Sequence, residues 1–211
     1  MATVTAPPIP AVLEGRIVNE VPVSVEEYLD RERAAVEEKH EYLDGWLISM
    51  TGASLPHNLI VSNLIRELGN QLRDTECRAV ANDFRVAMPS VDTYAYPDIV
   101  AYCGEPEVDE EHLDMISNPV LLVETLSPST EGYDRGEKFA RYRQLDSLQE
   151  YLLVAQDRPH VEHYVRQDDG SWRFTETDGL DAEIDLPSLD AALPLSELYL
   201  DIAFEPEGTG E

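Results

Sequence analysis

Basic residues, cysteines and long apolar runs are scarce in this sequence. Only 15 Lys and Arg stand against 43 Asp and Glu among 211 residues, so the formal net charge is −28. A charge of this sign and size argues against loose association with nucleic acid. No apolar run approaches the roughly 18–20 residues that a membrane-spanning helix requires, so no membrane partner is expected.

Cys77 and Cys103 are the two cysteines of the chain. Their wide separation indicates neither a disulfide framework nor a zinc cluster, and it is typical of a protein from a reducing compartment. The N-terminal residues lack a basic region followed by an apolar one, so no secretory signal is expected. The expected location is the cytoplasm.

The acidic residues are concentrated in two regions of the sequence. Residues 104–114 hold six acidic side chains and no Lys or Arg, and residues 168–211 hold thirteen against the single basic Arg173. We expect most of these acids to form a solvated surface. The densest basic cluster of the chain consists of Arg135, Lys138, Arg141 and Arg143.

The sequence predicts a single domain over residues 21–203. Residues 1–20 are rich in Pro and Ala and are expected to form a flexible tail, and residues 204–211 are expected to form an acidic C-terminal tail. Helices are predicted over residues 24–39, 54–74 and 134–147, and a single helical turn over residues 193–199. Strands are predicted over residues 78–89, 96–103, 119–126, 149–156, 160–167 and 171–177.

Turn signals complete this outline. Asp44-Gly45 lies between two short apolar segments and predicts a hairpin. The Arg158-Pro159 turn predicts a second hairpin, and Asp134 is expected to be the N-cap of the third helix. The alternation of helices and strands indicates one α/β domain, in which a central mixed β-sheet is flanked by helices.

Two carboxylates adjoin predicted strands that have the composition of buried strands. Glu124 ends the apolar run 120–123, and Asp98 begins the apolar strand at residues 99–103. Either acid alone is most simply a cap or turn residue. An unpaired buried charge costs several kcal/mol, however, so Glu124 requires a positive partner, a proton or a metal. Two carboxylates brought together repel each other unless a divalent cation such as Mg²⁺ lies between them, so the pair indicates a metal site.

Lys138 is the candidate positive partner. At about 100° per residue it shares a helix face with Phe139, Tyr142 and Leu145. This face is expected to pack on the sheet, where a lysine is rare unless it meets a carboxylate or a ligand. The alternative is a snorkelling side chain, with a buried stem and an ammonium group in water.

Four motifs together carry a resemblance to a known family. They are YPDIV (96–100), VLLVETLSPST (120–130), YDRGEKFARYR (133–143) and LQEYLLV (148–154). In this combination the chain resembles the Uma-type family of putative restriction endonucleases, within the PD-(D/E)XK nuclease superfamily. The segment 40–58, from HEYLDG to PHN, is similar to the family's N-terminal pattern. The resemblance runs from Ser24 to Tyr199 and implies a restriction-endonuclease-like fold and a metal-dependent endonuclease that hydrolyses DNA.

The resemblance also implies roles for individual residues. Asp98 and Glu124 would be metal ligands, with Mg²⁺ as the cation and Mn²⁺ as its substitute. The superfamily's catalytic lysine lies two residues after the second acid, where this chain has Leu126. The family pattern then assigns the role to Lys138 in the following helix. The products would carry 5′-phosphate and 3′-hydroxyl ends.

Three further residues are accessory candidates. Members of the superfamily often add an acid from an N-terminal element, which makes Glu41 a candidate third metal ligand; the alternative is an ordinary strand residue. His57 either faces the site or caps its helix locally, and the cap is the simpler interpretation. Asp83 is expected to support the sheet, with an accessory role at the site as the alternative.

The turn after Glu124 and the basic cluster complete the predicted site. Ser127, Ser129 and Thr130 are expected to shape a turn, because neither a G-x-S-x-G motif nor an obvious base accompanies them. The candidate contacts to the DNA backbone are Arg135, Arg141 and Arg143.

In this interpretation Lys138 orients or helps to deprotonate the attacking water and offsets charge on the transition state. The net charge predicts weak and salt-sensitive DNA binding, so we expect a homodimer or a basic partner to assist. Two alternatives stay open. One is a catalytically silent interaction protein with a nuclease fold, and the other is a metal-dependent phosphodiesterase that acts on small nucleotides.

Overall fold

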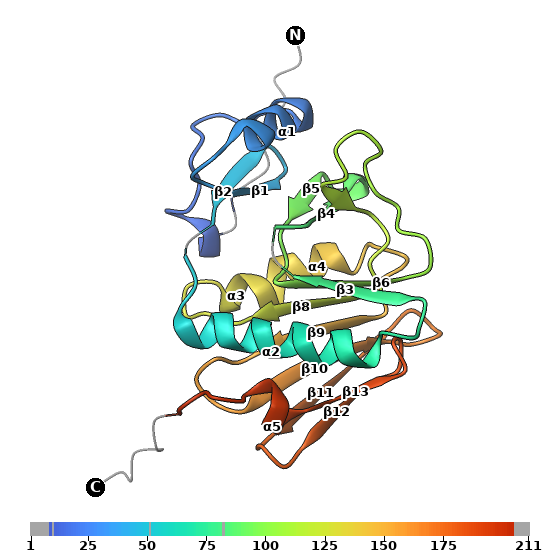
Figure 1. Ribbon diagram of the computed structural model, residues 1–211. Coiled ribbons are helices and arrows are strands. Elements are labelled where there is room, and N and C mark those ends of the chain that lie inside the picture. Colours follow the sequence, from blue (N-terminus) through green and yellow to red (C-terminus); the bar gives the residue numbers. More distant parts are fainter. Residues whose placement is uncertain (1–8, 10, 51, 82, 205–211) are drawn as a thin grey trace, which may run out of the picture.

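A six-stranded mixed sheet forms the centre of the computed structural model, which describes residues 9, 11–50, 52–81 and 83–204 (Figure 1). The strand order is β11-β10-β9-β8-β6-β3, with β8 and β9 parallel and the other neighbours antiparallel. The strands are β3 Cys77–Ala81, β6 Ile99–Cys103, β8 Leu121–Thr125, β9 Glu150–Val154, β10 His160–Arg166 and β11 Trp172–Asp178. The predicted mixed sheet is therefore confirmed.

A second sheet of five strands has the order β2-β1-β5-β4-β7. The hairpin predicted at Asp44-Gly45 is present, and φ is 49° and 93° at the two turn residues. A Cβ on Gly45 would lie 2.6 Å from Cβ of Pro22, so both the backbone conformation and the available space require glycine there. The strands are β1 His40–Leu43, β2 Trp46–Ser49, β4 Arg85–Met88, β5 Thr93–Ala95 and β7 Met115–Ile116.

The single strand predicted over residues 78–89 is in fact two strands that belong to different sheets. β3 ends at Ala81 and β4 begins at Arg85. Between them the chain bends at Asp83, whose φ is 59°. The prediction is wrong because the apolar pattern continues across the bend, whereas a left-handed residue interrupts an extended run.

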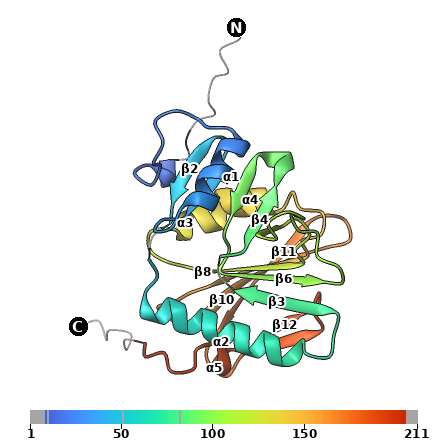
Figure 2. The same ribbon diagram turned by 45° about the horizontal axis from the view of Figure 1, so that its top comes forward.

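Helices cover both faces of the central sheet (Figures 1 and 2). α1 begins after its predicted cap Ser24, which accepts a hydrogen bond from the main-chain N of Glu27, but it ends at Ala34 instead of residue 39. In the described ranges, no helix is long and apolar enough to cross a membrane. The helices are η1 Ala11–Leu13, α1 Val25–Ala34, α2 Leu55–Gln71, η2 Pro89–Val91, α3 Glu131–Tyr133, the π-helical turn η3 Asp134–Lys138, α4 Phe139–Tyr142 and α5 Leu195–Leu198.

Alternate residues of β8 face opposite helices. Leu121 and Val123 belong to the core beneath α2, whereas Leu122 belongs to the core beneath α4, with Tyr142. Because side chains alternate along a strand, Glu124 lies on the same face as Leu122. The sheet therefore directs Glu124 toward the helical segment that carries Lys138.

The C-terminal part of the chain completes the core on the α2 face. β12 (Glu183–Leu186) and β13 (Ala191–Pro194) form a two-stranded sheet that the sequence patterns did not predict. The helical turn predicted over residues 193–199 is present as α5. The ring of Phe204 lies 5.4 Å from that of Tyr199, so packing continues just past residue 203. The rest of the expected acidic tail, residues 205–211, lies outside the described residues.

The expected tail over residues 1–20 is shorter than predicted. Residues 1–8 and residue 10 lie outside the described residues, but Leu13 is fully buried in a cluster with Ile48 and Tyr133. Ile17 forms a β-bridge with Ile48 of β2. The Pro- and Ala-rich composition concealed this packing, since the anchoring residues are single apolar side chains without a period. The domain therefore includes residues from at least Leu13 onward.

Cys77 and Cys103 form a disulfide across β3 and β6, where they are direct cross-strand partners. The expectation of two separate thiols is wrong because the antiparallel register, which the cysteine spacing does not reveal, places them opposite each other. This pairing removes the argument for a reducing compartment, and the cytoplasmic location stays a prediction.

Candidate active site

A cavity of about 350 Å³ is lined by both large sheets, α2 and η3. Its walls come from β1, the first turn of α2, the start of β6, the end of β8 and the turn at residues 127–130. Among the described residues, its charged and histidine side chains are Glu41, Asp98, Glu124, Asp134, Lys138, Arg16 and His57. The two predicted metal ligands and the predicted lysine are thus brought together in one place.

Asp98 directly precedes β6, and Glu124 lies in β8, the antiparallel neighbour of β6. Ile99 of β6 pairs with Val123 of β8, and the same register sets Asp98 opposite Glu124. Opposite residues of an antiparallel pair point to the same face of the sheet. The main-chain N of Thr125 donates a hydrogen bond of 2.6 Å to Oδ2 of Asp98. This bond holds the Asp98 carboxylate at the end of β8, where both residues line the cavity.

Lys138 is the partner that the buried Glu124 requires. Its Nζ lies 2.8 Å from Oε1 of Glu124, 2.9 Å from Oε1 of Glu41 and 3.8 Å from Oδ1 of Asp134. The residue is only 6% exposed, so the snorkelling alternative is wrong. The predicted helix face is confirmed, because Phe139, Tyr142 and Leu145 are also buried.

The helical turn that carries Lys138 is irregular. Asp134 to Lys138 form a π-helical turn, a conformation that is rare and concentrated at functional sites. Asp134 is not the N-cap that was predicted: Thr130 occupies the cap position of α3, and Asp134 is buried beside Lys138. An acid at the start of a predicted helix has the same sequence signature in both roles, which is why the pattern misplaced it.

The charges of the cavity are unbalanced, with more carboxylates than cations around one ammonium group. Burial raises the pKa of Glu124 well above its ordinary value, an effect that Lys138 opposes and that the nearby acids reinforce. Burial likewise raises the pKa of Asp134. Burial alone would lower the pKa of Lys138, but Glu124, Glu41 and Asp134 outweigh it and raise this pKa well above the ordinary value. Lys138 is therefore a cation at neutral pH.

Glu41 reaches the site from the second sheet. β1 places it opposite Ile48, and its side chain is buried. Its Oε1 accepts hydrogen bonds from Lys138 and, at 3.0 Å, from the main-chain N of Tyr96. The alternative of an ordinary strand residue paired across the hairpin does not describe these contacts. In this structure Glu41 holds Lys138 in position, and its role as a third metal ligand stays a prediction.

His57 faces the site and does not cap its helix. Ser54 is the N-cap of α2, and its Oγ accepts a hydrogen bond from the main-chain N of His57. The His57 ring lies in the first turn, with Nε2 3.2 Å from Oδ2 of Asp98. The simpler interpretation of His57 as a local cap is therefore wrong, because the serine three positions earlier already fills that role.

The turn after β8 closes one side of the cavity. Oγ of Ser127 lies 3.1 Å from Oγ of Ser129 and 2.8 Å from Oγ1 of Thr130. All three side chains line the cavity, and Ser127 bonds to each of the other two. The expected role of the hydroxyl side chains in shaping the turn is confirmed.

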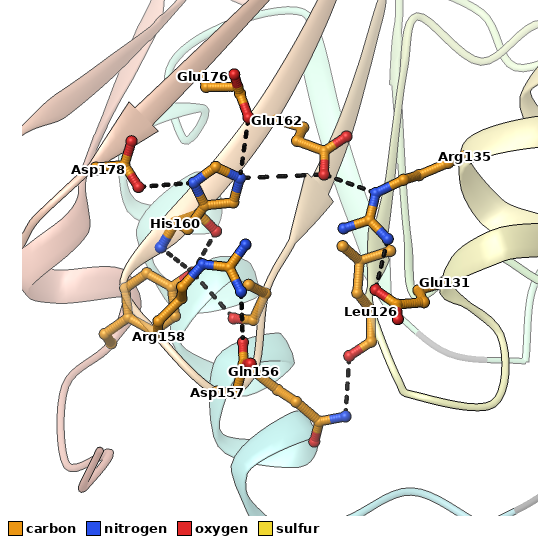
Figure 3. A network of polar contacts seen from close by, with 12 residues as sticks. Leu126, Glu131, Arg135, Gln156, Asp157, Arg158, His160, Glu162, Glu176 and Asp178 are labelled. Carbon is orange, nitrogen blue, oxygen red and sulfur yellow. Dashed lines mark hydrogen bonds and ion pairs between the residues drawn. The ribbon is translucent and has the colours of Figure 1, made fainter. Parts of the chain in front are cut away.

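Arg135 is held away from the cavity by two acids. It donates to Glu131 at 2.6 Å and to Glu162 at 2.7 Å (Figure 3). With Arg158 it lines a separate cavity of about 90 Å³. Its position does not link it to the carboxylate cluster, and its contact with DNA stays a prediction.

Arg141 and Arg143 also lie outside the carboxylate cavity. Arg141 forms an ion pair with Asp44 in the β1–β2 turn and donates to the main-chain O of Val91 at 2.7 Å. The guanidinium of Arg143 lies 5.3 Å from the ring centre of Phe139. Arg141 thus ties α4 to the second sheet, and the expected DNA contacts of both arginines stay predictions.

Asp83 is remote from the carboxylate cluster. It lies on the exposed bend between β3 and β4, forms an ion pair with Lys39 and does not line either cavity in the described part of the chain. The accessory role at the site has no support in this geometry. Asp83 instead shapes the bend that separates the two sheets.

Sequence patterns missed residues that line the cavity and one buried hydrogen-bond donor that contacts Glu124 from outside the cavity lining. Arg16 lies in the segment assigned to the tail, and Tyr142, read as a core residue, donates a hydrogen bond of 2.8 Å to Oε1 of Glu124. Gln156 connects the start of α2 to the end of β8. It accepts a hydrogen bond of 2.5 Å from Ser54 and donates one of 2.9 Å to the main-chain O of Leu126. The position of Tyr142, four residues after Lys138 on the same helix face, could have indicated that it lies near Glu124. No sequence pattern indicated that Arg16 or Gln156 lines the cavity.

The cavity fits a cation held by two protein carboxylates. Asp98 and Glu124 offer the oxygen ligands that Mg²⁺ selects, and Mg²⁺ is usually held by one or two carboxylates with water and substrate phosphates completing its shell. Over the described ranges, no group of three or more His, Cys, Asp and Glu side chains is arranged to hold a metal ion. The residues therefore do not form a complete protein cage, and a cation held by Asp98 and Glu124 would need further ligands from outside this set.

A comparison with solved structures identifies the fold. The crystal structure of a putative nuclease belonging to DUF820 from Anabaena variabilis matches with a TM-score of 0.70 and 20% identity, over 84% of this chain and 98% of that chain. The fold is thus a restriction-endonuclease-like nuclease fold, as predicted.

Sequence relatives extend the comparison. An uncharacterized protein of Synechocystis, sll1609, is 38% identical over 159 residues, which cover 75% of this chain and 89% of that protein. Another, slr1290, is 35% identical over 182 residues, which cover 86% and 94%. The family model Uma2, described as putative restriction endonuclease, matches residues 25–200. The chain belongs to this family.

Proposed function

We propose that the protein is a metal-dependent endonuclease that hydrolyses phosphodiester bonds of DNA. The observation that carries the proposal is the convergence of Asp98, Glu124 and Lys138 in one cavity, from two strands and a π-helical turn. Phosphodiester hydrolysis requires charge stabilisation and an activated water, and this combination of carboxylates and a buried lysine suits both. Membership of a family described as putative restriction endonuclease supports the same activity.

Asp98 and Glu124 would hold the cation, with Glu41 as the proposed third ligand. A bound Mg²⁺ or Mn²⁺ would polarise the scissile phosphate and lower the pKa of a water molecule. Asp98 is oriented for this purpose by the main-chain N of Thr125 and by His57. Tyr142 donates to Oε1 of Glu124, the oxygen that Lys138 also contacts, and helps to orient this carboxylate.

Lys138 would act as a fixed positive charge and hydrogen-bond donor. Because its neighbours raise its pKa, it keeps its proton at neutral pH and is a poor acceptor for the proton of the attacking water. Of the functions expected from the sequence, orienting the water and offsetting transition-state charge are therefore favoured over deprotonating the water. Glu41 and Asp134 hold the ammonium group in place for this role.

DNA is the proposed substrate, bound weakly and with a steep salt dependence. The net charge of −28 repels a polyanion, and the cavity itself contains four carboxylates. The expected homodimer, which would add a second DNA-binding surface, stays a prediction.

A phosphodiesterase that acts on small nucleotides is the second candidate. The cavity volume of about 350 Å³ lies within the range of small-molecule sites, and an acidic surface penalises a small anion less than a polymer. The alternative of a catalytically silent interaction protein has less support. A buried lysine in a cavity with four carboxylates is costly to maintain, and binding a partner does not require it.

The test is a hydrolysis assay on plasmid DNA, single-stranded DNA and a dinucleotide, each in EDTA, Mg²⁺ and Mn²⁺. We expect cleavage of DNA only with a divalent cation, with 5′-phosphate and 3′-hydroxyl products. Asp98→Ala should abolish it, and Asp83→Asn, which removes the charge of an exposed acid outside the cavity and tolerates the left-handed backbone there, should not. Hydrolysis of the dinucleotide alone would favour the second candidate, and cleavage by Asp98→Ala at the parental rate would overturn the site assignment.

A further inference from the structure

Arg16 is the arginine of the carboxylate cavity. In the described part of the chain, Arg16 and Lys138 are the lysine and arginine side chains that line it. Lys138 is already committed to three acids, with Nζ within 4 Å of each. Arg16 is therefore the cation that remains available to an anionic ligand entering the cavity. It also precedes residues 25–200, the part of the chain that matches the family model.

The chain holds Arg16 firmly at this position. The main-chain N of Ser49 donates to the main-chain O of Arg16 at 2.9 Å, and one guanidinium nitrogen donates to the main-chain O of Ser49 at 3.0 Å. The next residue, Ile17, forms a β-bridge with Ile48. On the other side Leu13 is buried against Tyr133, which itself lines the cavity. The segment 13–17 is thus attached both to β2 and to α3, which directly precedes the π-helical turn of Lys138.

Arg16 also has unused hydrogen-bonding capacity. Its Nε is buried and has no hydrogen-bond partner among the described residues, and no ion pair of Arg16 is present there. A buried N–H without an acceptor costs free energy, and this chain has 43 acidic residues that could have supplied one. Nη2 already donates to Ser49, whereas Nη1 has no hydrogen bond in the described residues and is not among the buried unpaired atoms, so one charged phosphate oxygen is the fitting acceptor.

We propose that Arg16 binds a non-bridging phosphate oxygen of the substrate strand and positions that phosphate against the Asp98–Glu124 pair. The proposal rests on the proposed function, since it takes the substrate to be a phosphodiester. It assigns to the N-terminal segment a direct part in substrate binding. A purely structural role, in which Arg16 only attaches this segment to Ser49, is the competing explanation.

The experiment compares three substitutions with a matched control. Arg16→Ala removes the guanidinium group, Arg16→Gln keeps a donor for the main-chain O of Ser49 without the charge, and Arg16→Lys keeps the charge. Arg73→Ala is the control, because Arg73 is exposed and lines neither cavity. Melting temperatures establish that each variant is folded before binding and cleavage are measured.

Binding is measured with a fluorescent DNA duplex in Ca²⁺, over a series of KCl concentrations. Losing one phosphate contact should reduce the slope of log K against log salt by about 0.9 for a duplex. We expect this reduction for Arg16→Ala and Arg16→Gln, little change for Arg16→Lys and none for Arg73→Ala. A structural role would change affinity without changing the slope, because no counterion release would be lost.

Cleavage provides the second readout. We expect kcat/KM to fall about tenfold to 100-fold in Arg16→Ala and Arg16→Gln, the loss of one charged hydrogen bond. A substrate with one methylphosphonate, which lacks the charged oxygen, should slow the parent by a similar factor and leave Arg16→Gln nearly unaffected.

Slopes and rates in the Arg16 variants equal to those of Arg73→Ala would overturn the role of Arg16. If the parent binds DNA but does not cleave it, the proposed function fails and the salt slope alone still decides the role of Arg16; a parent that neither binds nor cleaves DNA overturns both.

Discussion

Nζ of Lys138 lies 2.8 Å from Oε1 of Glu124, and both side chains are almost completely buried. The pair joins the end of β8 to the π-helical turn that follows it. Neither charge would be stable at its position alone, since desolvating an unpaired ion costs several kcal/mol. Glu41 and Asp134 surround the same ammonium group. One lysine thus holds together three acids that would otherwise repel one another.

Lys138→Met should therefore affect stability as well as turnover. Methionine preserves the apolar stem but leaves Glu124 and Glu41 buried without their cation, a loss of about 3–5 kcal/mol for a broken buried pair. We also expect turnover to fall by at least about 100-fold, because the fixed charge at the reacting phosphate is lost. Urea unfolding and single-turnover cleavage measure the two effects.

Lys39→Met is the matched control for this substitution. Lys39 pairs with Asp83 at an exposed position, where an ion pair contributes only about 0–1 kcal/mol. We expect its stability and turnover to remain close to those of the parent. Parental turnover in Lys138→Met would show that this lysine only supports the structure.

Tyr142→Phe should weaken the orientation of Glu124. The substitution removes a buried donor 2.8 Å from Oε1 of a carboxylate, and a hydrogen bond to a charged group contributes about 1.5–3 kcal/mol. We expect a loss of stability in this range and a smaller loss of turnover than in Lys138→Met, because the cation remains. Equal stability of the variant and the parent would mean that another donor replaces the tyrosine.

Asp114→Asn should give a pH-dependent loss of stability. Burial alone would raise the pKa of Asp114, but the guanidinium groups of Arg33 and Arg85 lower it below its ordinary value of 3.8. A lowered folded-state pKa contributes stability that is present above the unfolded value and is lost as the pH falls through the folded-state value. The difference between the parent and the variant should therefore be largest at neutral pH and shrink below pH 3.8.

Unfolding by urea over the range from neutral pH to about pH 3 measures this difference. Asp181→Asn, at an exposed position, controls for removing one charge from a very acidic chain. A stability difference that stays constant with pH would show that the ion pairs with Arg33 and Arg85 do not stabilise the folded state.

Reduction of the Cys77–Cys103 disulfide should lower stability without changing the active site. Closing a loop of this length stabilises a protein by about 3 kcal/mol in the chain-entropy model. Neither cysteine lines the carboxylate cavity in the described residues. We expect dithiothreitol to lower the melting temperature of the parent, to leave that of Cys77→Ser unchanged, and to leave the rate of cleavage unaffected. A rate that follows the redox state would connect this sheet edge to the site.

Much of this site was predictable because its residues adjoin elements with strong local patterns. The apolar run before Glu124 and the helical spacing of Lys138 with Phe139 and Tyr142 are local signals, and both placed their residues correctly. The Asp44-Gly45 hairpin is local in the same sense, since two adjacent residues determine its turn.

The remaining features depend on contacts between distant segments. Arg16 reaches the cavity only because Leu13 and Ile17 pack on elements that come later in the chain. An aspartate at the start of a helical segment has the same sequence signature whether it caps the helix or lies buried in a site. Only the neighbouring Lys138, which the fold places beside Asp134, distinguishes the two roles. The Cys77–Cys103 bond follows from a strand register that no single-strand pattern specifies.

The most direct test of the proposed metal site is a calorimetric titration with Mn²⁺ or Ca²⁺ in the absence of DNA. Four proteins are compared: the parent, Asp98→Asn, Glu124→Gln and, as the matched control, Asp83→Asn. We expect a saturable site in the parent and in Asp83→Asn, and an affinity lower by more than about 100-fold in the other two variants, since each has lost a direct ligand. The same binding in all four proteins would mean that the cation only screens the acidic surface, and it would contradict the assignment of Asp98 and Glu124 as metal ligands.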